Sequence, residues 1–216
     1  KTAPQMPALV LTCSSAALIF ASSSLLSLSA VSTTFGSNLG ISVANDSLAN
    51  AATKKTNELY AQIFADVYGL KLMGFRYFNI FGPRQDPDGP YAAVIPMFMN
   101  ALLSNQSPVI HGEGDQSRDF TYIDNVVQAN IRALFTEKED AFGEMFNVGY
   151  GEATSILDLF KMLKTSVNSS LEPTFVAPRV GDVKDSLADI SKTQNLLGLE
   201  SDLNYIFHRI LHSHDI

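Results

Sequence analysis

The chain has 216 residues and a formal net charge of −7; 46% of its residues are hydrophobic and 17% are charged, which predicts a globular protein with a substantial core. Its 15 basic residues are outnumbered by 22 acidic ones, which excludes broad nucleic-acid binding because phosphates must be neutralised by a surplus of Lys and Arg. One cysteine excludes an intramolecular disulfide and a cysteine-clustered zinc site, and four histidines without carboxylate or thiolate spacing predict no metal site.

The N-terminal region is apolar but interrupted by hydroxyl side chains. Residues 8–31 make a poor membrane span, because each Ser and Thr hydroxyl would need a partner within the lipid. We interpret Ala16–Ala21 as a buried parallel strand followed by a serine turn. The alternative is a secretory signal peptide, whose N-terminal charge would come from Lys1. We therefore expect no membrane segment and a cytoplasmic protein.

From residue 51 onward the periodicity alternates between helix and strand. Residues 51–68 carry Leu59, Ile63 and Val67 on one face and stop at Gly69, which predicts an amphipathic helix with a glycine cap. In chain order we next expect a strand over 70–81, a helix over 92–104 and a strand at 109–110. A helix capped by Asp124 and reaching Phe135 and a strand over 145–148 follow. The last expected elements are a helix capped by Ser155, a strand over 174–177 and a helix over 190–197 that ends at Gly198. This alternation predicts a parallel α/β sheet with crossover helices.

Three short motifs occur in a fixed order along the second part of the chain. They are Arg-Tyr-Phe-Asn-Ile-Phe-Gly at residues 76–82, Ser-Arg-Asp-Phe at 117–120 and Arg-Val-Gly-Asp at 179–182. Taken alone, an adjacent pair such as Arg118 and Asp119 is typical of a surface salt bridge. Together the motifs resemble the NAD-dependent epimerase/dehydratase family of extended short-chain dehydrogenases, most closely its branch of UDP-N-acetylglucosamine 4-epimerases, over roughly residues 16–200.

The resemblance corresponds to the second half of the family and implies a domain organisation. We expect an α/β fold in which a partial Rossmann-like parallel sheet is joined by a small C-terminal substrate-binding α/β subdomain. Residues 1–90 would form the nucleotide-binding part and 91–216 the substrate-binding part, with 145–155 returning to the sheet. The 216 residues contain no glycine-rich turn of the G-x-G-x-x-G or G-x-x-G-x-x-G type, so the usual pyrophosphate cradle is missing from the sequence.

The resemblance also implies catalytic positions. Family enzymes carry a Tyr four residues before a Lys on one helix, and here the register places Asn50 before the retained Lys54. The ammonium lowers the pKa of the phenol, which then takes a proton from a sugar hydroxyl; Asn has no titratable proton for this role. For the strand-end serine we favour Ser24, while residues 32–34, before Phe35 and Gly36, offer a competing alignment.

Ligand contacts follow from the same resemblance. The implied cofactor is NAD, with contacts from Ser22, Lys54, Tyr77 and Phe78. The implied substrate is a UDP-sugar, either UDP-N-acetylglucosamine or UDP-glucose. A pair of guanidiniums is a natural clamp for its diphosphate, while Asn79 would reach the diphosphate and Asp182 a ribose hydroxyl. The expected substrate contacts are Asn79, Ala93, Val94, Ile95, Val109, His111, Arg118, Arg179 and Asp182.

Two functions are consistent with this pattern. The first is a UDP-sugar 4-epimerase, rendered inactive as it stands if Asn50 and the missing glycine-rich turn deprive it of acid/base and cofactor. The second is a non-catalytic relative that binds a sugar nucleotide or pairs with a complete subunit. A nucleotide-sugar dehydratase or decarboxylase is a further alternative within the enzyme class. Kinship also leads us to expect a homodimer.

Overall fold

The computed structural model describes residues 9–12, 17–19, 46–88, 93–179 and 181–199. The chain divides into two compact units, each assembled from separate stretches of sequence. We call them the sheet unit (1–77, 126–148 and 190–199) and the pocket unit (78–125, 149–189 and 200–216). The expected boundary at residue 90 between a nucleotide-binding and a substrate-binding part stays a prediction. The two units are defined by the contacts within each of them and not by the ligands they bind.

The sheet unit contains a four-stranded sheet in the order β2-β1-β3-β8. Its strands β1, β3 and β8 are mutually parallel, as predicted, whereas β2 runs antiparallel to β1. The expectation of a parallel strand within Ala16–Ala21 was therefore wrong in direction. Four residues separate β1 from β2, and a parallel connection needs a crossover of about a dozen or more. The strands are β1 (Leu9–Thr12), β2 (Ala17–Ile19), β3 (Leu72–Tyr77) and β8 (Met145–Val148).

Aromatic and sulfur-containing side chains fill the interior of this sheet. Phe75 and Phe146 are fully buried on neighbouring strands, with ring centroids 6.0 Å apart. A Cβ on Gly74 would lie 2.1 Å from the Met145 sulfur, so the absence of a side chain on β3 makes room for the methionine on β8. The strand 145–148 was predicted with the bounds that the structure gives it.

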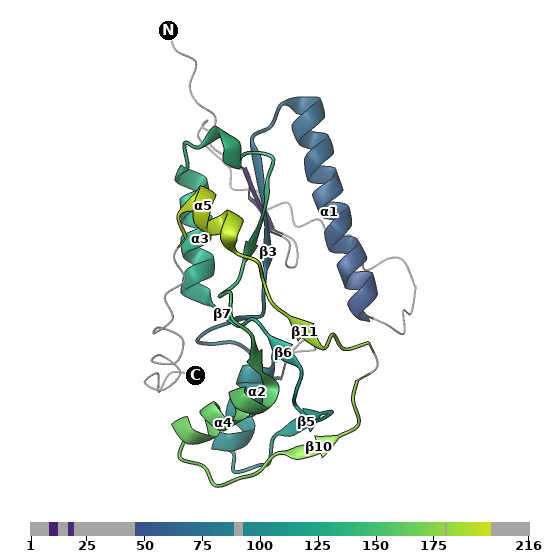
Figure 1. Ribbon diagram of the computed structural model, residues 1–216, viewed down its shortest axis with the longest axis vertical. Helices are drawn as coiled ribbons and strands as arrows, with labels where there is room; N and C mark the ends of the chain where they lie inside the picture. Colours follow the sequence, from purple (N-terminus) through teal and green to yellow (C-terminus); the bar gives the residue numbers. More distant parts are fainter. Residues whose placement is uncertain (1–8, 13–16, 20–45, 89–92, 180, 200–216) are drawn as a thin grey trace. The chain divides into compact units, whose positions relative to one another are not determined.

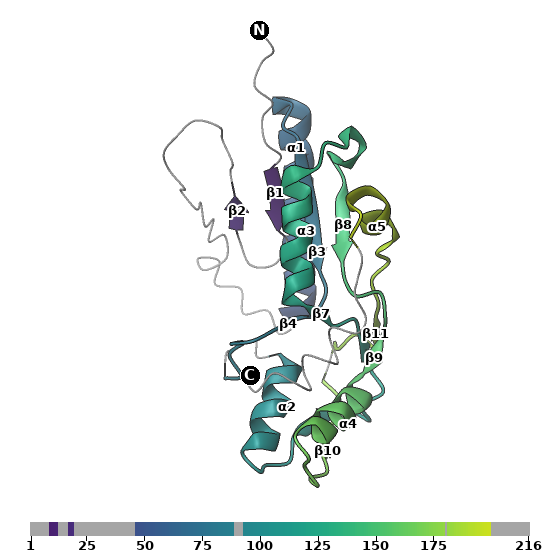
Figure 2. The same cartoon turned by 90° about the vertical axis from the view of Figure 1, so that its left-hand side faces the viewer.

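Helices α1 and α3 cover opposite faces of this sheet (Figures 1 and 2). Helix α1 ends as predicted at Gly69, which has a positive φ of 63° and donates its N–H to the Ala65 carbonyl. Gly198 ends α5 in the left-handed conformation, also as predicted. Asp124 lies inside the first turn of α3 rather than capping it, because the helix begins one residue earlier. The helices are α1 (Asp46–Tyr68), α3 (Ile123–Phe135), the short 3-10 helix η1 (Glu139–Ala141) and α5 (Ser191–Leu197).

An ion pair between a buried carboxylate and an exposed arginine joins α1 to β3. The Glu58 carboxylate accepts hydrogen bonds from Arg76 Nε at 2.5 Å and Arg76 Nη2 at 2.8 Å, and it is only 9% exposed. The Arg76 hydrogen bonds, assisted by Lys55, lower the pKa of Glu58 to about 2 despite the opposing effect of burial.

This pair predicts a loss of stability in acid. A carboxyl whose folded pKa is depressed stabilises the fold above its unfolded pKa and loses that contribution as pH falls through the folded pKa. We therefore expect the free energy of unfolding to drop by about 2 to 3 kcal/mol between pH 4.5 and pH 2 because of Glu58. Urea titrations across this range test it against Glu58→Gln, whose own pH dependence should be flatter; equal slopes would contradict the assignment.

The pocket unit packs two helices against short strand pairs. Its buried cluster includes Phe98 of α2 and Phe160 of α4, whose rings meet edge to face with centroids 6.2 Å apart. Ser155 caps α4 as predicted, since its hydroxyl accepts the Asp158 N–H at 3.0 Å. The elements are β4 (Ile80–Phe81), α2 (Val94–Leu103), β5 (Val109–His111), β6 (Ser117–Arg118), β7 (Thr121–Tyr122), β9 (Thr154–Ser155), α4 (Ile156–Ser166), β10 (Thr174–Val176) and β11 (Asp185–Ser186).

These strands form three small sheets. Strand β4 pairs with β7 and β5 with β10, both in parallel, and β6 lies between β9 and β11. The predicted strand over 70–81 is in fact broken: β3 ends at Tyr77, β4 begins at Ile80, and Asn79 between them has a positive φ of 28°. No helix in the described part of the chain is long and apolar enough to cross a membrane.

Candidate functional site

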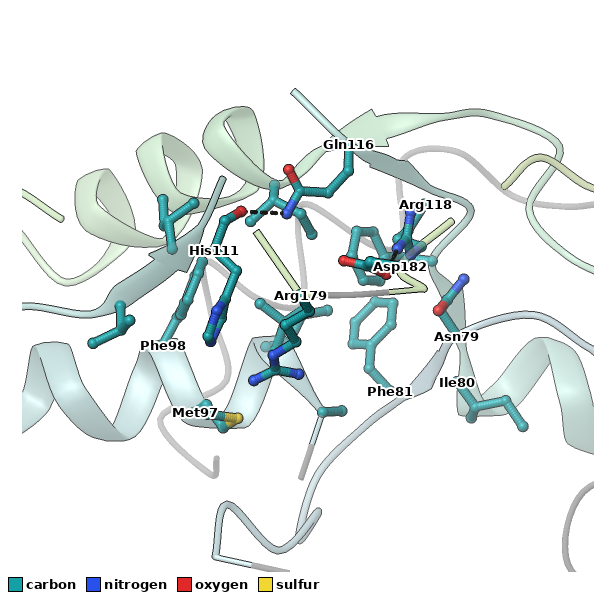
Figure 3. A pocket seen from close by; sticks show the side chains of 17 residues that line it. Asn79, Ile80, Phe81, Met97, Phe98, His111, Gln116, Arg118, Arg179 and Asp182 are labelled. Carbon is teal, nitrogen blue, oxygen red and sulfur yellow. Dashed lines mark hydrogen bonds and ion pairs between the residues drawn. The ribbon is translucent and has the colours of Figure 1, made fainter. Parts of the chain in front are cut away.

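A pocket of about 260 Å³ lies within the pocket unit (Figure 3). Its lining comes from the segment after β3, from the start of α2, from β5 and β6, and from the loop before β11. This lining brings together every residue that the sequence suggested for the substrate: Asn79, Ala93, Val94, Ile95, Val109, His111, Arg118, Arg179 and Asp182.

The guanidinium of Arg118 is held in place by protein acceptors at one end of the pocket. Its Nη1 donates to the carbonyl of Ser117 at 2.7 Å and to that of Lys184 at 3.3 Å. Its Nη2 donates to Asp182 Oδ1 at 2.5 Å, and the side chain is 16% exposed. Arg118 therefore pairs with a residue 64 positions away and not with its neighbour Asp119.

Arg179 differs from Arg118 in having no acceptor among the described residues. Its side chain is exposed, and its guanidinium points into the middle of the pocket (Figure 3). Two permanently charged, planar groups thus line one small cavity together with a single carboxylate. Such a site favours an anion with several oxygens.

A buried carboxylate behind Arg118 ties three segments of the pocket unit together. Asp119 is fully buried; its Oδ1 accepts the Tyr150 N–H at 2.7 Å, and its Oδ2 accepts those of Gly151 and Ala188 at 2.9 and 3.2 Å. Its backbone carbonyl also accepts the Asn79 amide at 2.9 Å. One donor of Asn79 is therefore used to fix the chain beside the pocket. Sequence reasoning gave Asp119 no role of its own, although a buried carboxylate demands hydrogen-bond partners.

His111 presents a defined ring nitrogen to the pocket. Its Nδ1 lies 3.2 Å from the Ala177 carbonyl, which can only accept, so Nδ1 carries the proton and Nε2 is the acceptor in the neutral ring. Gln116 holds the same residue from behind by donating to the His111 carbonyl at 2.8 Å (Figure 3).

Most of the lining that sequence reasoning missed is apolar. Phe81, Phe98 and Phe120 read as core residues in a sequence, because wall and core have the same pattern. Gln116 could have been found, since it stands two positions before Arg118 and alternate residues of an extended segment share a face. The missed lining residues are Ile80, Phe81, Met97, Phe98, Ile110, Gln116, Phe120 and Ile156.

The expected catalytic residues belong to the sheet unit or lie outside the described residues. Ser24 falls outside them, as does Ser22, which was expected to contact the cofactor. Asn50 and Lys54 are both in α1, and their four-residue spacing puts them one helical turn apart. Lys54 is half-buried.

Tyr77 does not replace the missing tyrosine as a base. Burial raises its pKa to about 12, although the Asn130 amide nitrogen donates to its hydroxyl at 2.9 Å. The phenol therefore stays neutral near pH 7.

Comparison with known proteins places this chain in a family. Residues 8–149 match the model of the NAD dependent epimerase/dehydratase family. The chain belongs to this family. The chain is 36% identical to UDP-glucose 4-epimerase of Mycolicibacterium smegmatis over 148 residues. The aligned region covers 68% of the chain and 46% of that protein. UDP-N-acetyl-alpha-D-glucosaminuronate decarboxylase of Bacillus cytotoxicus is 40% identical over 102 residues, 47% of the chain and 30% of that protein.

A solved structure extends the similarity over nearly the whole chain. UDP-N-acetylglucosamine 4-epimerase from Methanobrevibacter ruminantium M1, in complex with UDP-N-acetylmuramic acid, superimposes with a TM-score of 0.75 at 32% identity. The match covers 95% of this family member and 61% of that chain. The match covers less than half of the length of each of these two curated relatives.

NAD is the cofactor of the family, and the residues present fit it in part. Tyr77 ends β3 at the carboxyl edge of a parallel sheet, where open α/β sheets bind their ligands. The sequence offers no glycine-rich turn for the cofactor's pyrophosphate. The cofactor contacts that the resemblance implies for Lys54, Tyr77 and Phe78 stay predictions.

Proposed function

We propose that this chain is of the UDP-sugar 4-epimerase type and binds a UDP-sugar in the pocket of the pocket unit. The observation that carries the proposal is the convergence of nine residues, drawn from motifs spread over more than a hundred positions, on one cavity with two guanidiniums. Polar groups that converge on a concave, largely apolar wall are the usual form of a small-molecule site.

The chemistry of the lining suggests how the ligand is divided along the pocket. Arg118 and Arg179 are suited to the diphosphate, because each guanidinium can bond two phosphate oxygens. Val109 and His111 of β5 are assigned to the base, and Asp182 to a ribose hydroxyl. Ala93, Val94 and Ile95 at the start of α2 leave room for the sugar, which fits either UDP-N-acetylglucosamine or UDP-glucose.

Binding and turnover are separate questions for this chain. Bound NAD would supply a hydride acceptor and donor at the sugar carbon. The chain's own residues must move the accompanying proton, and Asn50 cannot do so because a carboxamide does not titrate in the useful range. We therefore propose that the protein as it stands binds the sugar nucleotide and converts it poorly, which also accommodates the alternative of a non-catalytic relative.

The test of binding is a calorimetric titration with UDP. Arg179→Ala is expected to weaken UDP binding by about 10- to 100-fold, because a charge-assisted contact to the diphosphate is lost. Lys161→Ala, which removes the same charge from the exposed face of α4, should leave the Kd unchanged within about twofold. A parent protein that gives no heat with UDP would remove the proposal altogether.

The exposed face of α1 supports the expected homodimer. Six large apolar or aromatic side chains on this helix are 46–66% exposed in the described part of the chain: Leu59, Tyr60, Ile63, Phe64, Val67 and Tyr68. A patch of this kind commonly marks an interface. The mass of the protein in solution decides whether two copies associate.

A decarboxylase or dehydratase remains the second enzymatic candidate. The Bacillus cytotoxicus relative is a decarboxylase, so family membership by itself does not fix the reaction. Dehydration is expected to need a Glu or an Asp-Glu pair in the helix region of residues 46–54. That region contains only Asp46, which favours epimerisation.

A further inference from the structure

The carboxylate of Asp182 occupies one of the two guanidiniums that line the pocket. Asp182 Oδ1 accepts from Arg118 Nη2 at 2.5 Å, while Nη1 of the same group is committed to the carbonyls of Ser117 and Lys184. Both terminal nitrogens of Arg118 therefore have acceptors supplied by the protein. Arg179 has none among the described residues.

This asymmetry decides what an anion meets in the pocket. Seen from a few ångströms away, the negative charge of Asp182 cancels much of the positive charge of Arg118. The carboxylate also accepts from Nη2, a nitrogen that a phosphate oxygen would otherwise use. A simple anion can thus pair fully with Arg179, but it must compete with Asp182 for Arg118.

The exposure of the two partners indicates which of them moves. The Arg118 side chain is 16% exposed and anchored by two carbonyls, whereas the Asp182 side chain is 38% exposed. Asp182 also follows Gly181, which has a positive φ of 84°. The carboxylate is the partner that can turn toward another donor at lower cost.

We propose that Asp182 acts as an internal competitor for the ligand's phosphate and makes the pocket selective for nucleotides over simple anions. A ligand that brings both a diphosphate and a nearby sugar hydroxyl compensates Asp182 with a new hydrogen bond while it takes over Arg118. Pyrophosphate, which has no hydroxyl, must break the ion pair without compensation. This inference rests on the proposed binding of a sugar nucleotide and concerns the specificity of that same pocket.

The experiment compares inorganic pyrophosphate with UDP on the full chain. Asp182→Asn keeps the size of the side chain but removes its charge, so it should tighten the Kd for pyrophosphate by about three- to tenfold. The gain for UDP should be smaller, because the carboxylate that accepts a hydroxyl is lost at the same time. Asp115→Asn removes an equal charge from the exposed pair with Lys184, outside the pocket lining, and should change either Kd by less than about twofold.

A double-mutant cycle isolates Arg118. Arg118→Gln should cost at least about threefold more pyrophosphate affinity in the Asp182→Asn background than in the parent, because the guanidinium is then free to bind the anion. Thermal melts of each variant confirm that the affinities compare folded proteins.

The outcomes separate this inference from the proposed function. If UDP binds the parent but Asp182→Asn gains nothing for pyrophosphate, or gains no more than Asp115→Asn does, the competition is refuted and the binding proposal stands. If pyrophosphate binding tightens in Asp182→Asn while UDP never binds the parent, the competition holds and the proposed function fails. If neither the parent nor any variant binds UDP or pyrophosphate, both the competition and the proposed function are refuted.

Discussion

Asn50→Tyr is expected to raise the rate of UDP-sugar 4-epimerisation by about 10²- to 10⁴-fold when NAD is supplied. A Tyr at this position would stand one turn of α1 from Lys54, whose ammonium favours the phenolate. The phenolate can then take the proton of the sugar's 4-hydroxyl, which the Asn carboxamide cannot accept. Chromatographic separation of UDP-N-acetylglucosamine or UDP-glucose from its C4 epimer measures the effect.

A matched variant isolates the hydroxyl in this experiment. Asn50→Phe has the same ring without the titratable group and should stay at the parent's rate, and Lys54→Met should remove most of the gain from Asn50→Tyr. If the Tyr and Phe variants bind UDP equally well and are equally silent, residue 50 is not the deficit. The lack of a glycine-rich turn would then account for the low rate.

Asp119→Ala is expected to lower the free energy of unfolding by about 3 to 5 kcal/mol, a large share of a typical domain's stability. The substitution would leave the N–H groups of Tyr150, Gly151 and Ala188 without their acceptor in a buried place. Gly149, whose Cβ would lie only 2.7 Å from Asp119 Oδ2 in the parent, has no side chain that could replace the lost acceptor. Urea unfolding followed by circular dichroism measures the loss in a chain without Trp.

Two variants bracket this result. Asp119→Asn keeps one acceptor oxygen and should fall between the parent and Asp119→Ala. Glu152→Ala removes an exposed carboxylate close by in the chain and should change stability by less than about 0.5 kcal/mol. An Asp119→Ala midpoint within error of the Glu152→Ala midpoint would show that the carboxylate does not hold these segments.

Local signals predicted much of the fold. The alternation Met-Phe-Asn-Val and the Ser155 cap lie where the structure has β8 and the start of α4. Gly198 ends α5 because a glycine adopts the left-handed conformation at no steric cost. These features depend on residues within one helical turn or one strand, so a sequence contains them in full.

Long-range features were not accessible in the same way. An apolar run such as Ala-Leu-Ile has the same composition in either direction of pairing, so β2 was assigned the wrong one. The break at Asn79 depends on a hydrogen bond to a carbonyl 40 residues away. The ion pair of Arg118 with Asp182 likewise spans 64 residues, so no local pattern identifies it.

The candidate pocket was predicted through its polar residues rather than its walls. Motif residues such as Arg179 and Asp182 have side chains whose chemistry suggests a ligand even before their positions are known. Phe98 and Ile156 give no such hint, because a side chain that faces a cavity and one that faces another side chain are equally apolar.

The interleaving of the two units has a consequence for dissecting the protein. Within the described residues the polypeptide passes from one unit to the other after residues 77, 125, 148 and 189, so both units consist of pieces that are not adjacent in the sequence. Cutting the gene after residue 77 or 125 would separate β8 from β3, and cutting it after 125 or 148 would separate the loop of Arg179 from Arg118. A cut after residue 189 would separate α5 from β8, against which it packs. Either unit could therefore be produced alone only by joining its pieces in a new order. A protease that cleaves one of the segments linking the two units should leave the two fragments bound to each other.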